Sequence, residues 1–443
     1  MPRLRPLALS CALFVLAPAA FADDAPAPTQ APAIEVVHCG HLFDSTSGRM
    51  LGETSIVIRG DRIESVQPGK IAPPAGMTAF HDLPTSTCLP GLIDAHTHLT
   101  GETSPTGYSD QFRWNIADYA IRSTVYAKRT LLAGFTTVRD LADTDYDSVA
   151  LRNAINAGVV PGPRIFTAGV AIGSTGGHAD PTDGYRHDLV GDPSAKDGII
   201  NSPEDAWKAV REHYKNGVDL IKIMPSGGVL DESSSVDNAQ LTIDEIKAVV
   251  AAAHDYGFTV AAHAHGAEGI RRAVVGGVDS IEHGTFMDDA DMKLMKEHGT
   301  WYVPTIIAGK YVEEKANIPG YYPPQVAAKA KQVGPIIQQT AGRAYRAGVK
   351  IAFGTDAAVY PHGENAKEFT YMVEAGIPPV YALQSATTHA AELLKKSKDL
   401  GSVEAGKYAD IIAVQGDPLQ DIAVMQKVEF VMKAGTVYKP AGP

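Results

Sequence analysis

Eight short apolar runs, each followed by a stretch with helical patterning, constrain the fold of this chain more than any other feature. The runs are 92–99, 136–140, 164–168, 220–224, 259–265, 280–283, 301–305 and 351–356. Runs of this length are typical of buried strands. Strands that alternate with helices form parallel sheets. The pattern therefore predicts an α/β fold, a (β/α)8 TIM barrel over residues 88–396, whose active site lies at the carboxyl ends of its strands.

Two of the intervening helices have recognisable starts. Ser202 is followed by a proline and two acidic residues, and Thr242 is followed three residues later by Glu245. The first pattern is a cap with a first-turn proline, and the second is a capping box. Gly217 and Gly257 supply the expected stops.

The two ends of the chain differ from the middle. Residues 34–87 contain short β-rich runs broken by Gly60-Asp61 and Pro68-Gly69, which is hairpin chemistry. Residues 397–443 continue in the same style. We therefore expect a small β-sandwich domain built from both termini.

The first 22 residues have the pattern of a secretion signal. Arg3 and Arg5 precede an apolar region, and Ala20-Phe21-Ala22 is a small-x-small cleavage site. Residues 23–33, rich in alanine and proline, predict a disordered leader. We expect an exported protein, periplasmic or secreted after cleavage.

The net charge limits the classes of partner, and the cysteine content bears on whether disulfides form. The formal net charge is −12, which argues against nucleic acid and anionic membranes as partners. Removal of the signal leaves only Cys39 and Cys88. Two cysteines are no disulfide framework, so we expect packed thiols, with a single bridge as the lesser alternative.

Polar residues with metal-binding chemistry end several of the predicted strands. They are His96, His98, Lys222, His263, His283 and Asp356. His96 and His98 are two apart, so a strand would point both to the same side. Any one of the six could be a satisfied core residue. Six at one mouth favour a metal centre, because buried groups of this kind are costly unless they are paired or coordinated.

Five motifs resemble the metal-dependent amidohydrolase superfamily: PGLIDAHTHL (90–99), IKIM (221–224), HAHG (263–266), IEHG (281–284) and GTDA (354–357). The segment GSVEAGKYADIIAV (401–414) resembles that family's return from barrel to sandwich. The resemblance covers essentially the whole mature chain. It implies a binuclear hydrolase with two divalent metal ions, zinc being the default for an imidazole-rich site.

The resemblance also assigns roles. His96, His98 and Asp356 would hold one metal, and His263 and His283 the other. Lys222, carboxylated by CO2, would bridge the two, unless it is instead a salt-bridged strand lysine. A hydroxide held by the metals would attack the scissile carbonyl, and Asp356 would accept its proton and pass it to the departing amine.

The segment TGGH (175–178) resembles the Xaa-Pro dipeptidase-like and ochratoxinase-like branch, which makes His178 a candidate contact to the substrate. His265 should share a strand face with His263 and is a second candidate.

We therefore expect hydrolysis of a small-molecule amide next to a C-terminal carboxylate, as in a dipeptide or an N-acyl amino acid. Ochratoxin A, cleaved to ochratoxin α and phenylalanine, fits this description. The branch also implies a homo-oligomer. Two alternatives remain: an ester hydrolase of the lactonase or phosphotriesterase type, and a non-catalytic exported metal- or solute-binding protein.

Overall fold

The apolar runs of the middle of the chain form parallel strands in two sheets. The computed structural model describes residues 32–182, 185–186, 188, 191–232 and 235–442, so the predicted signal and most of the predicted leader lie outside the described residues. One sheet has three strands, β6 (Leu92–Thr97), β7 (Phe135–Asp140) and β8 (Arg164–Thr167). The other has four, β9 (Ile221–Ile223), β10 (Val260–Ala264), β11 (Ser280–His283) and β12 (Trp301–Val303).

The eighth predicted run, 351–356, does not form a regular strand. Ile351 makes an isolated bridge with Tyr302 of β12, and Ala357 makes one with Thr97 of β6. The Ala95 amide also donates to the Phe353 carbonyl. The segment thus bonds to the last strand of one sheet and the first of the other, as in a TIM-barrel-type fold. Asp356, with a φ of 62°, interrupts regular pairing there.

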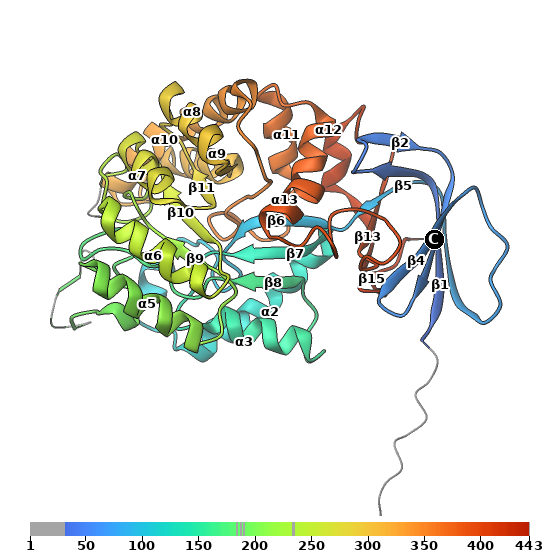
Figure 1. The fold of residues 1–443 in the computed structure, drawn as a ribbon, viewed down its shortest axis with the longest axis horizontal. Helices are drawn as coiled ribbons and strands as arrows, with labels where there is room; N and C mark the ends of the chain where they lie inside the picture. Colours follow the sequence, from blue (N-terminus) through green and yellow to red (C-terminus); the bar gives the residue numbers. More distant parts are fainter. Residues whose placement is uncertain (1–31, 183–184, 187, 189–190, 233–234, 443) are drawn as a thin grey trace, which may run out of the picture. The chain divides into compact units, whose positions relative to one another are not determined.

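Helices surround these strands (Figure 1). Their bounds are α1 Gly107–Asp110, α2 Ile116–Leu132, α3 Asp147–Asn156, α5 Pro203–Lys215, α6 Ile243–Asp255, α7 Ala267–Gly276, α8 Asp289–His298, α9 Ile306–Ala316, α10 Pro324–Ala347, α11 Lys367–Glu374, α12 Pro379–Gln384 and α13 Ala390–Leu393. Shorter 3-10 or π turns span Ala195–Asp197, Ser385–His389 and Ile422–Gln426.

The two predicted helix starts are confirmed. The Ser202 side chain accepts from the Asp205 amide, and Thr242 forms a reciprocal capping box with Glu245. Among the described residues, no helix combines the length and the apolar composition needed to span a membrane.

Strands from both ends of the chain share one eight-stranded sheet. The strands are β1 (Ile34–Asp44), β2 (Arg49–Leu51), β3 (Thr54–Arg59), β4 (Arg62–Pro68), β5 (Met77–Pro90), β13 (Ile411–Gln415), β14 (Val428–Lys433) and β15 (Thr436–Lys439). The main path runs β15-β14-β13-β5-β1-β3-β4, and β2 pairs with β1. β5 joins the two halves, since it pairs with β1 on one side and β13 on the other. The domain boundaries at residues 87 and 396 stay a prediction.

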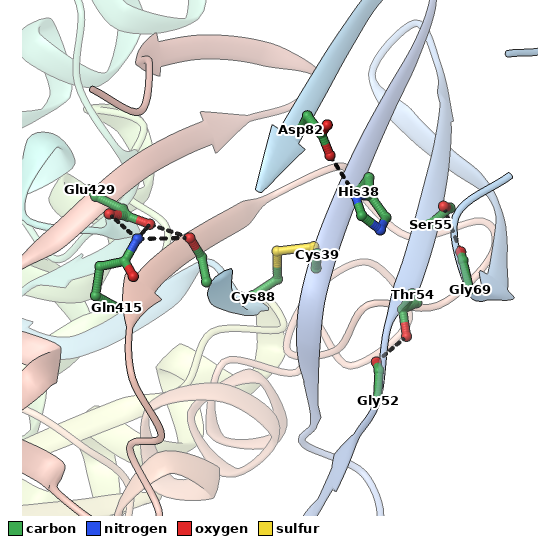
Figure 2. The surroundings of a disulfide bond; sticks show 11 residues. His38, Cys39, Gly52, Thr54, Ser55, Gly69, Asp82, Cys88, Gln415 and Glu429 are labelled. Atoms are coloured by element: carbon green, nitrogen blue, oxygen red, sulfur yellow. Dashed lines mark hydrogen bonds and ion pairs between the residues drawn. A yellow bond between two sulfur atoms is a disulfide. The ribbon is translucent and has the colours of Figure 1, made fainter. Parts of the chain in front are cut away.

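The expectation of packed thiols at Cys39 and Cys88 is wrong, because these residues form a disulfide (Figure 2). β1 and β5 pair in parallel, which brings the two Cα atoms to 5.9 Å, within the range a disulfide spans. Both residues are fully buried. The bond ties the first strand of the sheet to the strand that leads directly into β6.

Candidate metal centre

All eight predicted site residues line one cavity of about 250 Å³. They come from β6, β9, β10 and β11 and from the segments that follow β6, β8, β10 and α10. They are His96, His98, His178, Lys222, His263, His265, His283 and Asp356. The strand ends therefore converge on one mouth, as the strand pattern predicted.

His96, His98 and Asp356 form one group of possible metal ligands. Asp356 Oδ1 lies 3.0 Å from His98 Nε2 and 3.5 Å from His96 Nε2. His98 Nδ1 lies 3.0 Å from the Ala142 carbonyl, which can only accept, so Nδ1 donates and Nε2 is the nitrogen that faces Asp356. Burial would lower the pKa of His98, but the Asp356 carboxylate outweighs it and raises that pKa. Burial lowers the pKa of His96 to about 4, so its ring is neutral. Neutral imidazoles that present Nε2 are suited to ligate a metal.

His263, His265 and His283 form a second group. His263 Nε2 lies 3.1 Å from the Gly227 carbonyl, so this nitrogen donates and Nδ1 is the free lone pair. His283 Nδ1 contacts the Thr305 hydroxyl at 2.8 Å, and its φ of 68° turns the chain sharply at the end of β11. Burial, aided by the surrounding histidines and Lys222, lowers the pKa of His263 and His283 well below the usual range.

Lys222 lies fully buried in the middle of β9. Its Nζ has no hydrogen-bond partner among the described residues. Burial lowers the pKa of this ammonium to about 8. A buried amine with no partner costs free energy unless another group satisfies it. Lys222 is therefore suited to interact with a group bound in the cavity.

His178 lies on the loop after β8 and is held by an acidic partner. Its Nδ1 lies 2.7 Å from Asp231 Oδ2, and Lys329 Nζ of α10 contacts the other oxygen of Asp231 at 2.8 Å. Its ring centroid is 4.5 Å from that of His263. These two contacts, from Lys329 of α10 to Asp231 and from Asp231 to His178, therefore fix the orientation of the His178 ring in the cavity.

The remaining wall of the cavity is mostly apolar. Helices α9 and α10 and the loop after β9 contribute Val229, Leu230, Ala308, Gly309, Val312, Val333 and Ile337. One side of the cavity thus carries polar and charged groups, and the other can pack an apolar group of a ligand.

Sequence reasoning missed the residues that hold the candidate ligands. Glu282 Oε2 lies 2.9 Å from His96 Nδ1, and Arg139 donates to Glu282 Oε1 at 2.7 Å. Asp94 accepts from the amides of His96 and Thr355 and so ties β6 to the segment that carries Asp356. No local signal marks Glu282 or Arg139, because their strands, SIEH (β11) and FTTVRD (β7), contain other polar residues.

Comparison with known proteins shows which family the chain resembles. The model of the Amidohydrolase family matches residues 87–438. A crystal structure of a Xaa-Pro dipeptidase with methionine bound in the active site is 48% identical, with a TM-score of 0.89, and the match covers 92% of this chain and 100% of that chain. A prolidase structure complexed with N-methylphosphonate-L-proline is 34% identical, with a TM-score of 0.83 over the same shares of each chain. Ochratoxinase of Aspergillus niger is 32% identical over 383 residues, which cover 80% of this chain and 76% of the relative.

The chain belongs to the amidohydrolase family, in its dipeptidase and ochratoxinase branch. It is therefore a hydrolase of a metal-dependent superfamily, with histidine-rich groups suited to metal.

Proposed function

We propose that this protein is a binuclear amidohydrolase that cleaves an amide bond next to a C-terminal carboxylate. The observation that carries the proposal is the cavity itself, which is lined by two groups of candidate ligands and by a buried lysine whose Nζ finds no hydrogen-bond partner in the described part of the chain. A solute-binding protein would have no need for the Asp356 carboxylate among these ligands as a proton acceptor.

The residues present fit two divalent cations. His96, His98 and Asp356 would hold one and His263 and His283 the other, while Lys222, carboxylated by CO2, would bridge them. The neutral amine that carboxylation needs is favoured by the burial of Lys222, which lowers its pKa to about 8. Two such cations, with zinc as the proposed metal, would polarise the amide carbonyl and acidify the attacking water.

Asp356 is the proposed proton acceptor. Burial would raise the pKa of its carboxyl, but His96, His98 and Lys222 together lower it below the usual range, so the group is ionised. Its oxygen can accept the proton of the attacking water and deliver it to the amine nitrogen that leaves. His178, oriented through Nδ1 by Asp231, would contact the substrate carbonyl or carboxylate, and His265 is a second candidate for this contact.

Dipeptides and N-acyl amino acids with apolar side chains are the proposed substrates, and ochratoxin A is the specific candidate. The apolar wall formed by α9 and α10 supports this choice. Relatives support it too: one is a Xaa-Pro dipeptidase that holds methionine in its active site, and another is an ochratoxinase.

Metal analysis combined with a substrate panel tests the proposal. Purified protein should contain close to two metals per chain and should hydrolyse ochratoxin A or members of an N-acyl amino acid panel in a chelator-sensitive manner. Ester analogues of the same acids serve as the comparison, because hydrolysis of the esters without any hydrolysis of the matching amides would favour a lactonase. Metal-free protein with no turnover would refute the binuclear assignment.

Export and self-association are separate proposals. The disulfide supports export, because such bonds persist in oxidising compartments. A mature N-terminus at Asp23 would test it, and light scattering would test the proposed homo-oligomer.

A further inference from the structure

A charged pair lies fully buried behind His96. Arg139 is 1% exposed and Glu282 is 0% exposed. Arg139 is on β7 and donates through Nε to the Ala95 carbonyl of β6 at 2.6 Å. Its two remaining nitrogens donate to Ser280 Oγ at 3.0 Å and to Glu282 Oε1 at 2.7 Å on β11. One side chain thus connects three strands below the cavity.

Burying such a pair in the interior of a barrel costs free energy. Inward positions in this fold are usually occupied by branched apolar residues. A buried ion pair adds little net stability compared with apolar residues of similar volume, because both charges lose their hydration. The pair therefore calls for a role other than stability, and its second contact indicates one.

That contact is with a candidate metal ligand. Glu282 Oε2 lies 2.9 Å from His96 Nδ1. Arg139 and Ser280 both donate to the other oxygen, Oε1, so the carboxylate is ion-paired with Arg139 and Oε2 is left to accept from the ring. An ionised carboxylate can only accept, so it selects the His96 tautomer that carries its proton on Nδ1. Nε2, the nitrogen that faces Asp356, is then left with its lone pair.

We propose that Glu282, held by Arg139 and Ser280, is a positioning residue that fixes the tautomer and orientation in which His96 binds metal. This inference rests on the proposed function only in taking the group bound by His96 to be a metal ion. The tautomer itself is a property of the metal-free protein. Carboxylates that receive the distal N–H of a ligating histidine raise its affinity for metal, and their loss costs about 10- to 100-fold in that affinity.

Glu282→Gln is a sharp test, because glutamine keeps the shape but offers only one oxygen. Two donors, Arg139 and Ser280, point at the Oε1 position, so the amide oxygen should face them. The amide NH2 then faces His96 Nδ1 and favours the tautomer with its proton on Nε2. Metal at the His96 site should bind about 10- to 100-fold more weakly, measured by competition with a chelator of known affinity.

Nitrogen NMR of 15N-histidine-labelled, metal-free protein reads the tautomer directly, with the His96 signals assigned by their loss in His96→Gln. The expected result is Nδ1–H in the wild type and Nε2–H in Glu282→Gln. Asp291→Asn is the matched control, because Asp291 is equally buried and pairs with Arg271 at 3.3 Å, but lies on α8 outside the cavity wall. It should change neither the tautomer nor the metal affinity.

The outcomes separate the two proposals. Wild-type protein that binds no metal refutes the proposed function, whereas the tautomer measurement still tests the pair. Glu282→Gln that binds two metals with wild-type affinity and keeps Nδ1–H on His96 overturns the pair's role and leaves the proposed function standing. Should Glu282→Gln not fold, Ser280→Ala removes one donor to the carboxylate and should weaken metal binding in the same direction. An unchanged affinity in that variant would also overturn the inference.

Discussion

The substitution Gly228→Ala should lower the activity by displacing the ring of His178. A Cβ added there would lie 2.0 Å from Cε1 and 2.3 Å from both nitrogens of His178. Ordinary contact begins at 3.4 Å, so the ring would have to move by about 1.4 Å. It has little room to do so, because Asp231 holds Nδ1 at 2.7 Å and the centroid of the His263 ring is only 4.5 Å away.

The size of the effect follows from this displacement. A misplacement of about 1 Å can cost about 100-fold in rate. We therefore expect kcat/KM for a dipeptide or N-acyl amino acid to fall about 100-fold, which is about 2.7 kcal/mol of transition-state stabilisation. Metal content should not change. Folding should be largely intact, because the backbone of Gly228 lies outside the left-handed region and accepts alanine.

The control is Gly52→Ala, where an added Cβ has no atom within 4 Å, and it should leave kcat/KM unchanged. The double variant with His178→Ala completes a cycle. If Gly228→Ala acts only through the His178 ring, it should cause no further loss once that ring is gone. Wild-type activity in Gly228→Ala, or additive losses in the double variant, would refute the reasoning.

Four further predictions follow from the same contacts. Replacing both Cys39 and Cys88 by serine should lower the free energy of unfolding by about 4 kcal/mol relative to oxidised wild type, from loop closure over a sequence separation of 49, as measured by urea denaturation. Lys222→Ala should bind fewer metals and lose turnover, with partial recovery in millimolar short-chain carboxylates if the carbamate is the missing ligand. Asp356→Asn should lower kcat by about 100- to 10,000-fold through loss of its proton-transfer role, and unaltered kcat would remove Asp356 from that role. Substrates with an apolar side chain should exceed lysine or glutamate analogues in kcat/KM by about 100-fold, because the apolar wall cannot hydrate a charge.

The sequence pattern predicted those features of the fold that depend on residues close together in the chain. The alternation of strands and helices located the strands of both parallel sheets, and the two-residue spacing of His96 and His98 placed both rings near Asp356. The run at 351–356 was harder, because a left-handed residue at Asp356 ends the pairing that its apolar residues favour. The disulfide was missed because it depends on the parallel pairing of β1 with β5, which no local spacing reveals.

Glu282 shows why the support of the site could not be predicted in the same way. In a regular strand, neighbouring residues point to opposite faces, so choosing His283 as the inward residue assigns Glu282 to the outer face. The left-handed conformation of His283 breaks this alternation at the end of β11. Both side chains then reach the interior, Glu282 toward His96 and His283 toward the cavity.

Backbone carbonyls decide which nitrogen His98 and His263 present, and this choice depends on tertiary structure. Ala142 accepts from Nδ1 of His98, whereas Gly227 accepts from Nε2 of His263, so the two rings offer opposite nitrogens to the cavity. Ala142 follows β7 and Gly227 follows β9, each in a loop with no regular pattern. Residue type and strand position thus select which histidines meet, but the loops that follow neighbouring strands determine whether those histidines can ligate. A loop substitution that removed either carbonyl would therefore alter metal binding without touching a ligand.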